Sequence, residues 1–306
     1  KELTGYASMV TCPLEPRVTE EKAFEGYTRQ RVVIQTEPGI HMPFFVLIPD
    51  GLSDQPRPAV IAPHGHSSGG KAAVVGCAED DPLIAQTIRQ YNYDYGVQLV
   101  KAGFIVFCPD ARGFGERQEM AAKGDILASS CQAINQMAYP LGQTVTGMWA
   151  WDLHRLLDYI QTRPDCDRQR IGCAGLSGGG LQTLWASALD ERIRCAVISG
   201  YLYGYKESLL DMHTNCSCNY VPELYEYADM GDIAALIAPR PLLVETGNRD
   251  PLNGESGLEN VYSQVRIAQG AYRLAGTEAD LKHVVFDGEH RWDGVQAIPW
   301  LQQHLK

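Results

Sequence analysis

The sequence lacks the features that mark several classes of protein. No apolar run approaches the roughly 20 residues that a membrane-spanning helix needs, and no internal repeat or low-complexity tract is visible. Basic residues are fewer than acidic ones, 26 against 37, so the formal net charge is −11. Such a surface repels phosphate groups, which argues against a nucleic acid or an anionic membrane as a partner.

Targeting and cysteine signals are also sparse. Residues 1–10 lack the apolar stretch of a signal peptide, so we expect a cytoplasmic protein, although a processed secreted form would begin in the same way. The nine cysteines cannot all pair, and no CxxC pattern occurs. Cys216 and Cys218 are too close for an easy disulfide, and no second pair stands at zinc-finger spacing. We expect reduced thiols, several of them buried in strands, and neither a metal nor a cofactor.

Short apolar runs typical of strands alternate with helical patterns. Hydrophobic residues make up 45% of the 306 residues, which is enough for a sizeable core. The alternation predicts a doubly wound, mostly parallel sheet with helices on both faces, a three-layer α/β/α sandwich. We expect one domain over residues 1–306, with residues 1–30 as an N-terminal arm, a long insertion at 64–95 and a lid or cap at 201–235. Strands are predicted at 31–35, 41–48, 59–62, 104–108, 170–174, 195–199, 241–245 and 283–286, and helices at 94–102, 142–162, 180–188 and 298–304.

A candidate nucleophile stands between a predicted strand and a predicted helix. The run Gly175-Leu176-Ser177-Gly178-Gly179 fits the pattern G-x-S-x-G, which is informative in this strand–turn–helix setting. The residues two before and two after the serine must be small, because the strained turn brings backbone and helix together. Ser177 is therefore the predicted nucleophile.

A serine hydroxyl needs a base, and the base needs a group that orients it. His290 lies in the loop after the last predicted strand and is the predicted base. Asp250 follows the strand at 241–245 and is the predicted third member. Asp211 is its main rival, and Glu245 and Asp229 are weaker candidates.

The charge that develops on the substrate carbonyl needs two backbone N–H donors. The amide of Gly178, directly after the nucleophile, is one. The loop Pro63-His64-Gly65-His66 follows an early strand and offers the amide of His66 as the second. We do not expect His64 and His66 to bind a metal, because no carboxylate or further histidine stands at supporting spacing.

These residues, in this order, resemble those of α/β-hydrolases related to the dienelactone hydrolase and acetyl xylan esterase families. The resemblance covers residues 30–306. It includes the loop Pro109-Asp110-Ala111-Arg112-Gly113-Phe114-Gly115, which bacterial acetyl esterases and prolyl oligopeptidase-type peptidases also carry in similar form. Within this loop we expect Asp110 and Arg112 to pair and brace the turn.

The resemblance implies a serine esterase that needs no cofactor and acts on short-acyl esters, often acetyl groups on carbohydrates. Dienelactone hydrolases carry Cys at the nucleophile, so Ser177 favours ester over lactone hydrolysis. Tyr201 and Tyr203 follow a strand and are candidates for the substrate pocket. The segment His213–Pro222 has no counterpart in acetyl xylan esterases, which leaves the acyl and alcohol specificity open.

Two other functions stay open at this point. One is a serine peptidase of the prolyl oligopeptidase type, although 30 residues before the domain cannot supply the propeller that those enzymes carry. The other is a catalytically silent ligand-binding protein on the same fold. The sequence does not fix the oligomeric state, and a homo-oligomer is possible.

Overall fold

A computed structural model describes residues 1–51, 55–79 and 81–305. Its strands are β1 (Arg17–Phe24), β2 (Tyr27–Glu37), β3 (Ile40–Pro49), β4 (Arg57–Ile61), β5 (Ile105–Pro109), β6 (Cys166–Leu176), β7 (Cys195–Ser199), β8 (Leu242–Gly247) and β9 (Leu281–Phe286). Its α-helices are α1 (Lys71–Val74), α2 (Pro82–Tyr91), α3 (Tyr95–Lys101), α4 (Cys131–Ala138), α5 (Val145–Ile160), α6 (Gly178–Leu189), α7 (Leu224–Tyr227), α8 (Met230–Ala235), α9 (Leu258–Ala275) and α10 (Ala297–His304).

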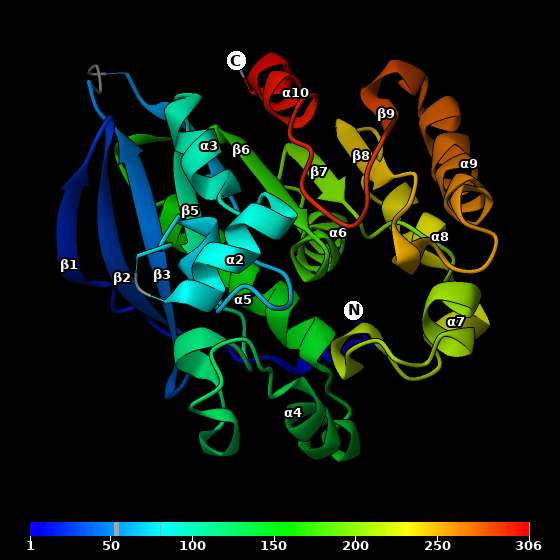
Figure 1. Ribbon diagram of the computed structural model, residues 1–306, viewed down its shortest axis with the longest axis horizontal. Coiled ribbons are helices and arrows are strands. Elements are labelled where there is room, and N and C mark those ends of the chain that lie inside the picture. The colour runs from blue at the N-terminus through cyan, green and yellow to red at the C-terminus, as the bar shows by residue number, and fades with distance from the viewer. Residues whose placement is uncertain (52–54, 80, 306) are drawn as a thin grey trace.

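The strands form one sheet in the order β1-β2-β3-β5-β4-β6-β7-β8-β9 (Figure 1). From β5 to β9 every neighbouring pair is parallel, whereas β1, β2 and β3 pair antiparallel. The neighbours of β4 are β5 on one side and β6 on the other, so the strand order reverses there. Ligands bind beyond the carboxyl ends of the strands at such a reversal.

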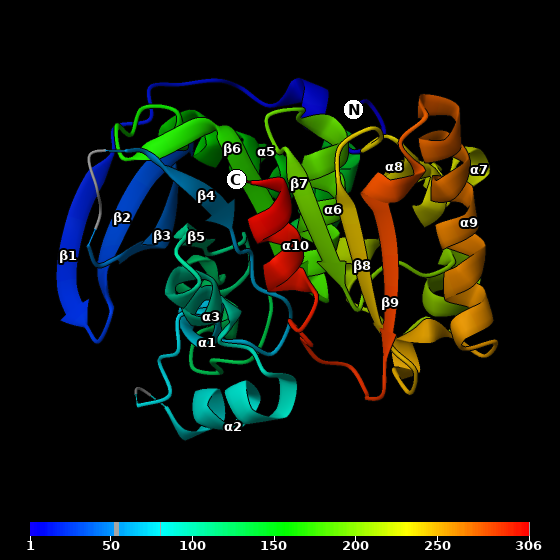
Figure 2. The same cartoon turned by 90° about the horizontal axis from the view of Figure 1, so that it is seen from above.

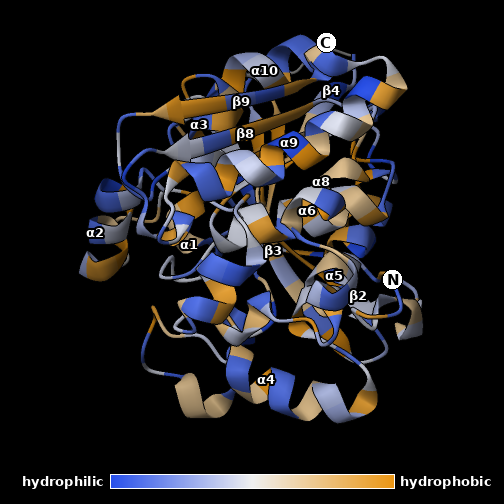
Figure 3. Ribbon diagram, turned by 90° about the vertical axis from the view of Figure 1, so that its right-hand side faces the viewer, coloured by the Kyte–Doolittle hydropathy of each residue, from blue (hydrophilic) through white to orange (hydrophobic). Residues whose placement is uncertain are grey.

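Helices cover both faces of the sheet, as Figure 2 shows, with α3 and α10 on one face and α5 and α6 on the other. The central strands are buried throughout because both of their faces pack against helices. In Figure 3 apolar strands lie behind helices that carry both hydrophilic and hydrophobic residues. The predicted three-layer, mostly parallel α/β sandwich is therefore confirmed.

The N-terminal arm predicted for residues 1–30 is not separate from the sheet. Strand β1 and the start of β2 pair antiparallel from Phe24 opposite Tyr27 to Arg17 opposite Val33. Almost every residue of β1 is exposed, and its one described neighbour in the sheet is β2. The strand gives no apolar alternation in the sequence because neither of its faces is buried.

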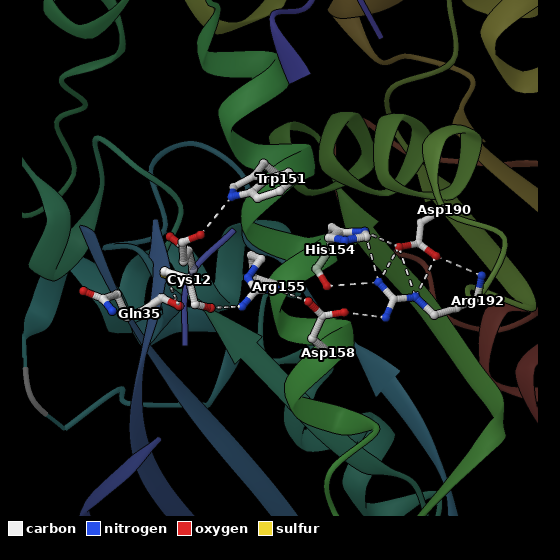
Figure 4. Close-up of polar contacts among 9 residues, drawn as sticks. Cys12, Gln35, Trp151, His154, Arg155, Asp158, Asp190 and Arg192 are labelled. Carbon is white, nitrogen blue, oxygen red and sulfur yellow. Dashed lines mark hydrogen bonds and ion pairs between the residues drawn. The ribbon is translucent and has the colours of Figure 1, made fainter. Parts of the chain in front are cut away.

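A polar network holds the chain before β1 and the loop after α6 against α5 (Figure 4). Arg155 Nη2 donates to the Cys12 carbonyl at 2.5 Å. Arg192 donates to Asp190 and to Asp158, and His154 Nδ1 lies 2.7 Å from Asp190 Oδ2. This side of α5 is therefore joined to both neighbouring segments by charged groups.

Among the described residues, no helix is both long and apolar enough to cross a membrane.

Candidate active site

Ser177 lies between the end of β6 and the start of α6, as the sequence predicted. Its backbone has φ 59° and ψ −121°, a conformation that side-chain-bearing residues rarely adopt. The turn is held by a hydrogen bond of 2.9 Å from the Ser177 amide to the Ser199 carbonyl on β7. The first turn of α6 begins at once, because the Leu181 amide donates to the Ser177 carbonyl at 2.9 Å.

The two glycines of the motif are required by close backbone contacts. A Cβ on Gly175 would lie 2.5 Å from the carbonyl carbon of Gly179. A Cβ on Gly179 would lie 2.2 Å from the Pro63 carbonyl oxygen, which belongs to the loop after β4. Glycine at these two positions lets the start of α6 approach both its own strand and that loop.

His290 and Asp250 meet across the loops after β9 and β8. His290 Nδ1 lies 2.6 Å from Asp250 Oδ2. A carboxylate can only accept, so Nδ1 carries the proton and Nε2 is left to act as an acceptor. Asp250 is fixed in turn, because its Oδ1 accepts from the Leu252 amide at 2.9 Å and its side chain is 1% exposed.

Ser177 and His290 line the same cavity, which has a volume of about 310 Å³. Gly178 and His66 also line it, so the residues predicted as nucleophile, base and oxyanion donors are brought to one place. Tyr201 and Tyr203 are part of the wall and are almost fully buried. The remaining lining residues are Ser67, Tyr91, Tyr93, Thr214, Asn215, Cys216, Asn219 and Leu252.

The loop after β4 is held by buried hydrogen bonds on several sides. Gln182 Nε2, from α6, donates to the His64 carbonyl at 2.8 Å, and Tyr93 Oη donates to the His66 carbonyl at 3.0 Å. His64 Nδ1 lies 2.8 Å from the Gly65 carbonyl, and its Nε2 accepts from the Ala111 amide at 3.1 Å. Burial lowers the pKa of His64 to about 4, so the ring is neutral. Both ring nitrogens are occupied, so His64 serves to position the loop.

The rivals of Asp250 lie elsewhere. Asp211 is exposed at the end of the π-helical segment Lys206–Asp211. Asp229 caps α8 and accepts from the Met230 amide at 2.7 Å. Glu245 is buried inside β8, where burial and the charge of Asp293 raise its pKa to about 7.

The predicted pair between Asp110 and Arg112 is wrong. Asp110 is fully buried and accepts from both the amide and the ammonium group of Lys71, at 2.8 and 2.5 Å. Arg112 instead bridges Asp152 on α5 and Glu37 on β2. The loop is braced, as expected, but each charge has a partner from a distant segment, which spacing along the chain cannot reveal.

The segment at 201–235 contributes wall residues that the sequence did not single out. Asn219 accepts from Tyr201 Oη at 3.0 Å and donates to the Cys216 carbonyl at 2.8 Å. Asn135 Nδ2, on α4, donates to the Ser217 carbonyl at 2.7 Å. These bonds fix the segment against α4 and so shape one side of the cavity.

A sequence model of the abhydrolase family matches residues 6–284. The chain belongs to the abhydrolase family. The predicted resemblance to α/β-hydrolases is thereby confirmed. This abhydrolase is 31% identical over 231 residues to a Bacillus subtilis (strain 168) protein named "Putative hydrolase YtaP", over 72% of this chain and 70% of that one.

Two further comparisons concern carbohydrate esterases. The abhydrolase is 28% identical over 148 residues to "Carbohydrate esterase MZ0003" from an unknown prokaryotic organism, over 42% of this chain and 33% of that one. Its fold is similar to that of BF1801 from Bacteroides fragilis NCTC 9343, described as "a putative acetyl xylan esterase". The TM-score is 0.77 at 19% identity, and the match covers 95% of this chain and 83% of that one.

Proposed function

We propose that this abhydrolase hydrolyses carboxylic esters through an acyl-enzyme on Ser177, with short-acyl esters of carbohydrates as the substrate class. The observation that carries the proposal is the convergence of Ser177 and a His290–Asp250 pair at one cavity. A serine beside a histidine that a carboxylate orients is the arrangement that nucleophilic acyl transfer requires.

In the proposed reaction His290 takes the proton from Ser177 Oγ as the oxygen attacks the ester carbonyl. Asp250 holds the imidazole in the tautomer that leaves Nε2 free and stabilises its charged form. The backbone amides of Gly178 and His66 donate to the developing oxyanion, supported by the N-terminus of α6. His290 then protonates the leaving alcohol, and water resolves the acyl-enzyme by the same route.

The substrate class rests on the cavity and on the relatives. A volume of about 310 Å³ is at the small end of ligand sites, which suits a short acyl group better than a long one. The relative MZ0003 is named as a carbohydrate esterase, and BF1801, which has a similar fold, is described as "a putative acetyl xylan esterase". Tyr201 and Tyr203 offer aromatic faces on which a sugar ring can pack.

The experiment is the variant Ser177→Ala assayed with p-nitrophenyl acetate. We expect a loss of about 10⁶-fold in kcat, because the nucleophile acts as a unit with its base. Ser187→Ala, a buried serine further along α6, is the control and should retain activity. Full activity in Ser177→Ala would contradict the proposal.

A fluorophosphonate probe separates the alternatives. Labelling of Ser177 is expected, and its absence would favour a silent binding protein. A panel of acetylated sugars, longer acyl esters, methyl esters of uronic acids and proline-containing peptides then identifies the substrate. Turnover of the peptides alone would favour the peptidase alternative.

A further inference from the structure

Three cysteines and one histidine from separate parts of the chain meet beside the cavity. A ring nitrogen of His66 and the Sγ atoms of Cys131, Cys216 and Cys218, here called the thiol–imidazole cluster, all lie within 4.8 Å of one another. His66 comes from the loop after β4, Cys131 begins α4, and the other two cysteines belong to the segment after Lys206–Asp211. All three cysteines are free thiols, so no disulfide explains their approach.

We propose that the thiol–imidazole cluster binds one zinc ion. Three thiols and one imidazole form a Cys₃His set, which is typical of structural zinc sites, and such soft ligands disfavour magnesium and calcium. On binding, each thiol releases its proton to solvent and the imidazole coordinates as a neutral ligand through Nε2. The filled site therefore carries a net charge of −1.

The distances suit a tetrahedral ion. With Zn–S near 2.3 Å and Zn–N near 2.0 Å, the ligand atoms of a tetrahedral site stand about 3.5–3.8 Å apart. Cys218 Sγ already lies 3.4 Å from His66 Nε2. No two of the ligand atoms are more than 4.8 Å apart, so a contraction of at most about 1 Å would bring them to tetrahedral distances.

The surroundings of the sulfur atoms suit thiolates. Asn219 Nδ2 points at Cys218 Sγ from 3.7 Å, and an amide N–H can only donate. Ser129 Oγ lies 3.9 Å from Cys216 Sγ. Donors to the coordinating sulfurs stabilise their charge, as the outer groups of metal sites do. Cys131 and Cys218 are completely buried, which excludes competing water from that side.

The role of the ion would be structural. Four protein ligands fill a tetrahedral zinc ion and leave no position for a water or a substrate. Through His66 the ion would fix the loop whose amide we propose as an oxyanion donor, and through Cys216 it would fix the neighbouring part of the cavity wall. Of the histidine pair His64 and His66, only His66 belongs to the cluster, because both nitrogens of His64 are occupied.

The first test is the metal content of the full chain, produced without a histidine tag in zinc-supplemented medium and measured by mass spectrometry. We expect about one zinc ion per chain in the wild type and in Ser177→Ala, and its loss in Cys216→Ser. Cys12→Ser, another partly exposed free cysteine, is the matched control and should keep the ion. Zinc in Ser177→Ala separates this proposal from that of the esterase reaction.

The second test does not depend on any variant folding. The wild-type protein is stripped with a chelator under reducing conditions and titrated with Co²⁺, which reports tetrahedral thiolate ligands through strong visible and near-ultraviolet absorption. We expect saturation at one equivalent. Absence of zinc together with absence of this spectrum would overturn the proposal. Thiols are also titrated after the stripped protein is denatured. A count of seven instead of the nine cysteines in the sequence would indicate a disulfide and would also overturn it.

Discussion

Glu245 is a single buried acid whose ionisation opposes folding. It lies in β8 with no exposed surface, and burial and the charge of Asp293 raise its pKa from 4.5 to about 7. The folded state therefore holds this proton more tightly than the unfolded state. Stability contributed by the protonated group is present below pH 4.5 and is lost as the pH rises towards 7.

We expect Glu245→Gln to remove this pH dependence. The free energy of unfolding of the variant relative to that of the wild type should be higher at pH 8 than at pH 5 by about 1–3 kcal/mol. Urea denaturation at both pH values measures the difference, and Glu21→Gln on the exposed strand β1 is the control. An equal difference between variant and wild type at both pH values would contradict the raised pKa.

The residues of the predicted triad could be proposed from the sequence because each follows a recognisable strand. Ser177 stands in a local sequence motif. Asp250 and His290 have no such motif and are predicted from their order along the chain, each in the loop after a later strand. The thiol–imidazole cluster could not be foreseen, because its members stand far apart in sequence, such as Cys131 and Cys216. Neither the number of cysteines nor their spacing indicates which of them meet.

Helix α6 and the loop after β4 touch without an intervening side chain at Gly179. We expect Gly179→Ala to push this loop away, because the new Cβ would lie 2.2 Å from the Pro63 carbonyl oxygen. Esterase kcat/KM should fall more than tenfold, and the free energy of unfolding should fall by about 1–3 kcal/mol.

Gly270→Ala is the matched control for this change. A Cβ there meets nothing within 4 Å, and the position lies inside α9. Glycine inside a helix loses more conformational freedom on folding than alanine does. We therefore expect Gly270→Ala to raise the free energy of unfolding by about 0.5–1 kcal/mol and to leave activity unchanged. Kinetics and thermal unfolding of the two variants, side by side, test the packing argument; a fully active Gly179→Ala would contradict it.

Most elements of the sheet could be predicted because buried strands are short apolar runs. The strand predicted at 195–199 is β7, and the strand predicted at 283–286 lies within β9 (Leu281–Phe286). Seven of the described strands and α-helices escaped prediction, namely strand β1 and the helices α1, α2, α4, α7, α8 and α9. Strand β1 is exposed on both faces, and α9 carries enough polar residues that its apolar stripe is not conspicuous. Elements with little buried surface leave little pattern in the sequence.

The whole molecule depends on contacts between distant segments, and the first 16 residues show this well. They lie outside the sheet, yet Thr144 Oγ1 donates to the Thr4 carbonyl at 2.8 Å and Arg155 donates to the Cys12 carbonyl. The Gln35 amide donates to the Leu14 carbonyl at 2.7 Å, which ties the same stretch to β2. The stretch therefore joins the antiparallel and parallel parts of the structure.

We expect Arg155→Met to loosen this stretch. Methionine fills similar space but leaves the Cys12 carbonyl without its donor, which should cost about 1–3 kcal/mol in the free energy of unfolding. Limited proteolysis should then cleave residues 1–16 faster than in the wild type. The control is Arg266→Met, which removes an exposed ion pair with Glu259 and should leave both the free energy of unfolding and the cleavage rate almost unchanged. Equal cleavage rates in the two variants would contradict the anchoring role of Arg155.

Within the part of the chain that the structure describes, β1 pairs with β2 alone, and this edge has a consequence for behaviour at high concentration. A strand with one free side can recruit a strand from another molecule and so start fibre growth. This one carries the exposed charged residues Arg17, Glu20, Glu21 and Lys22, distributed over both faces of the strand, which a second copy would have to desolvate. We therefore expect these charges to oppose edge-to-edge association, although β1 itself contributes almost nothing to the core.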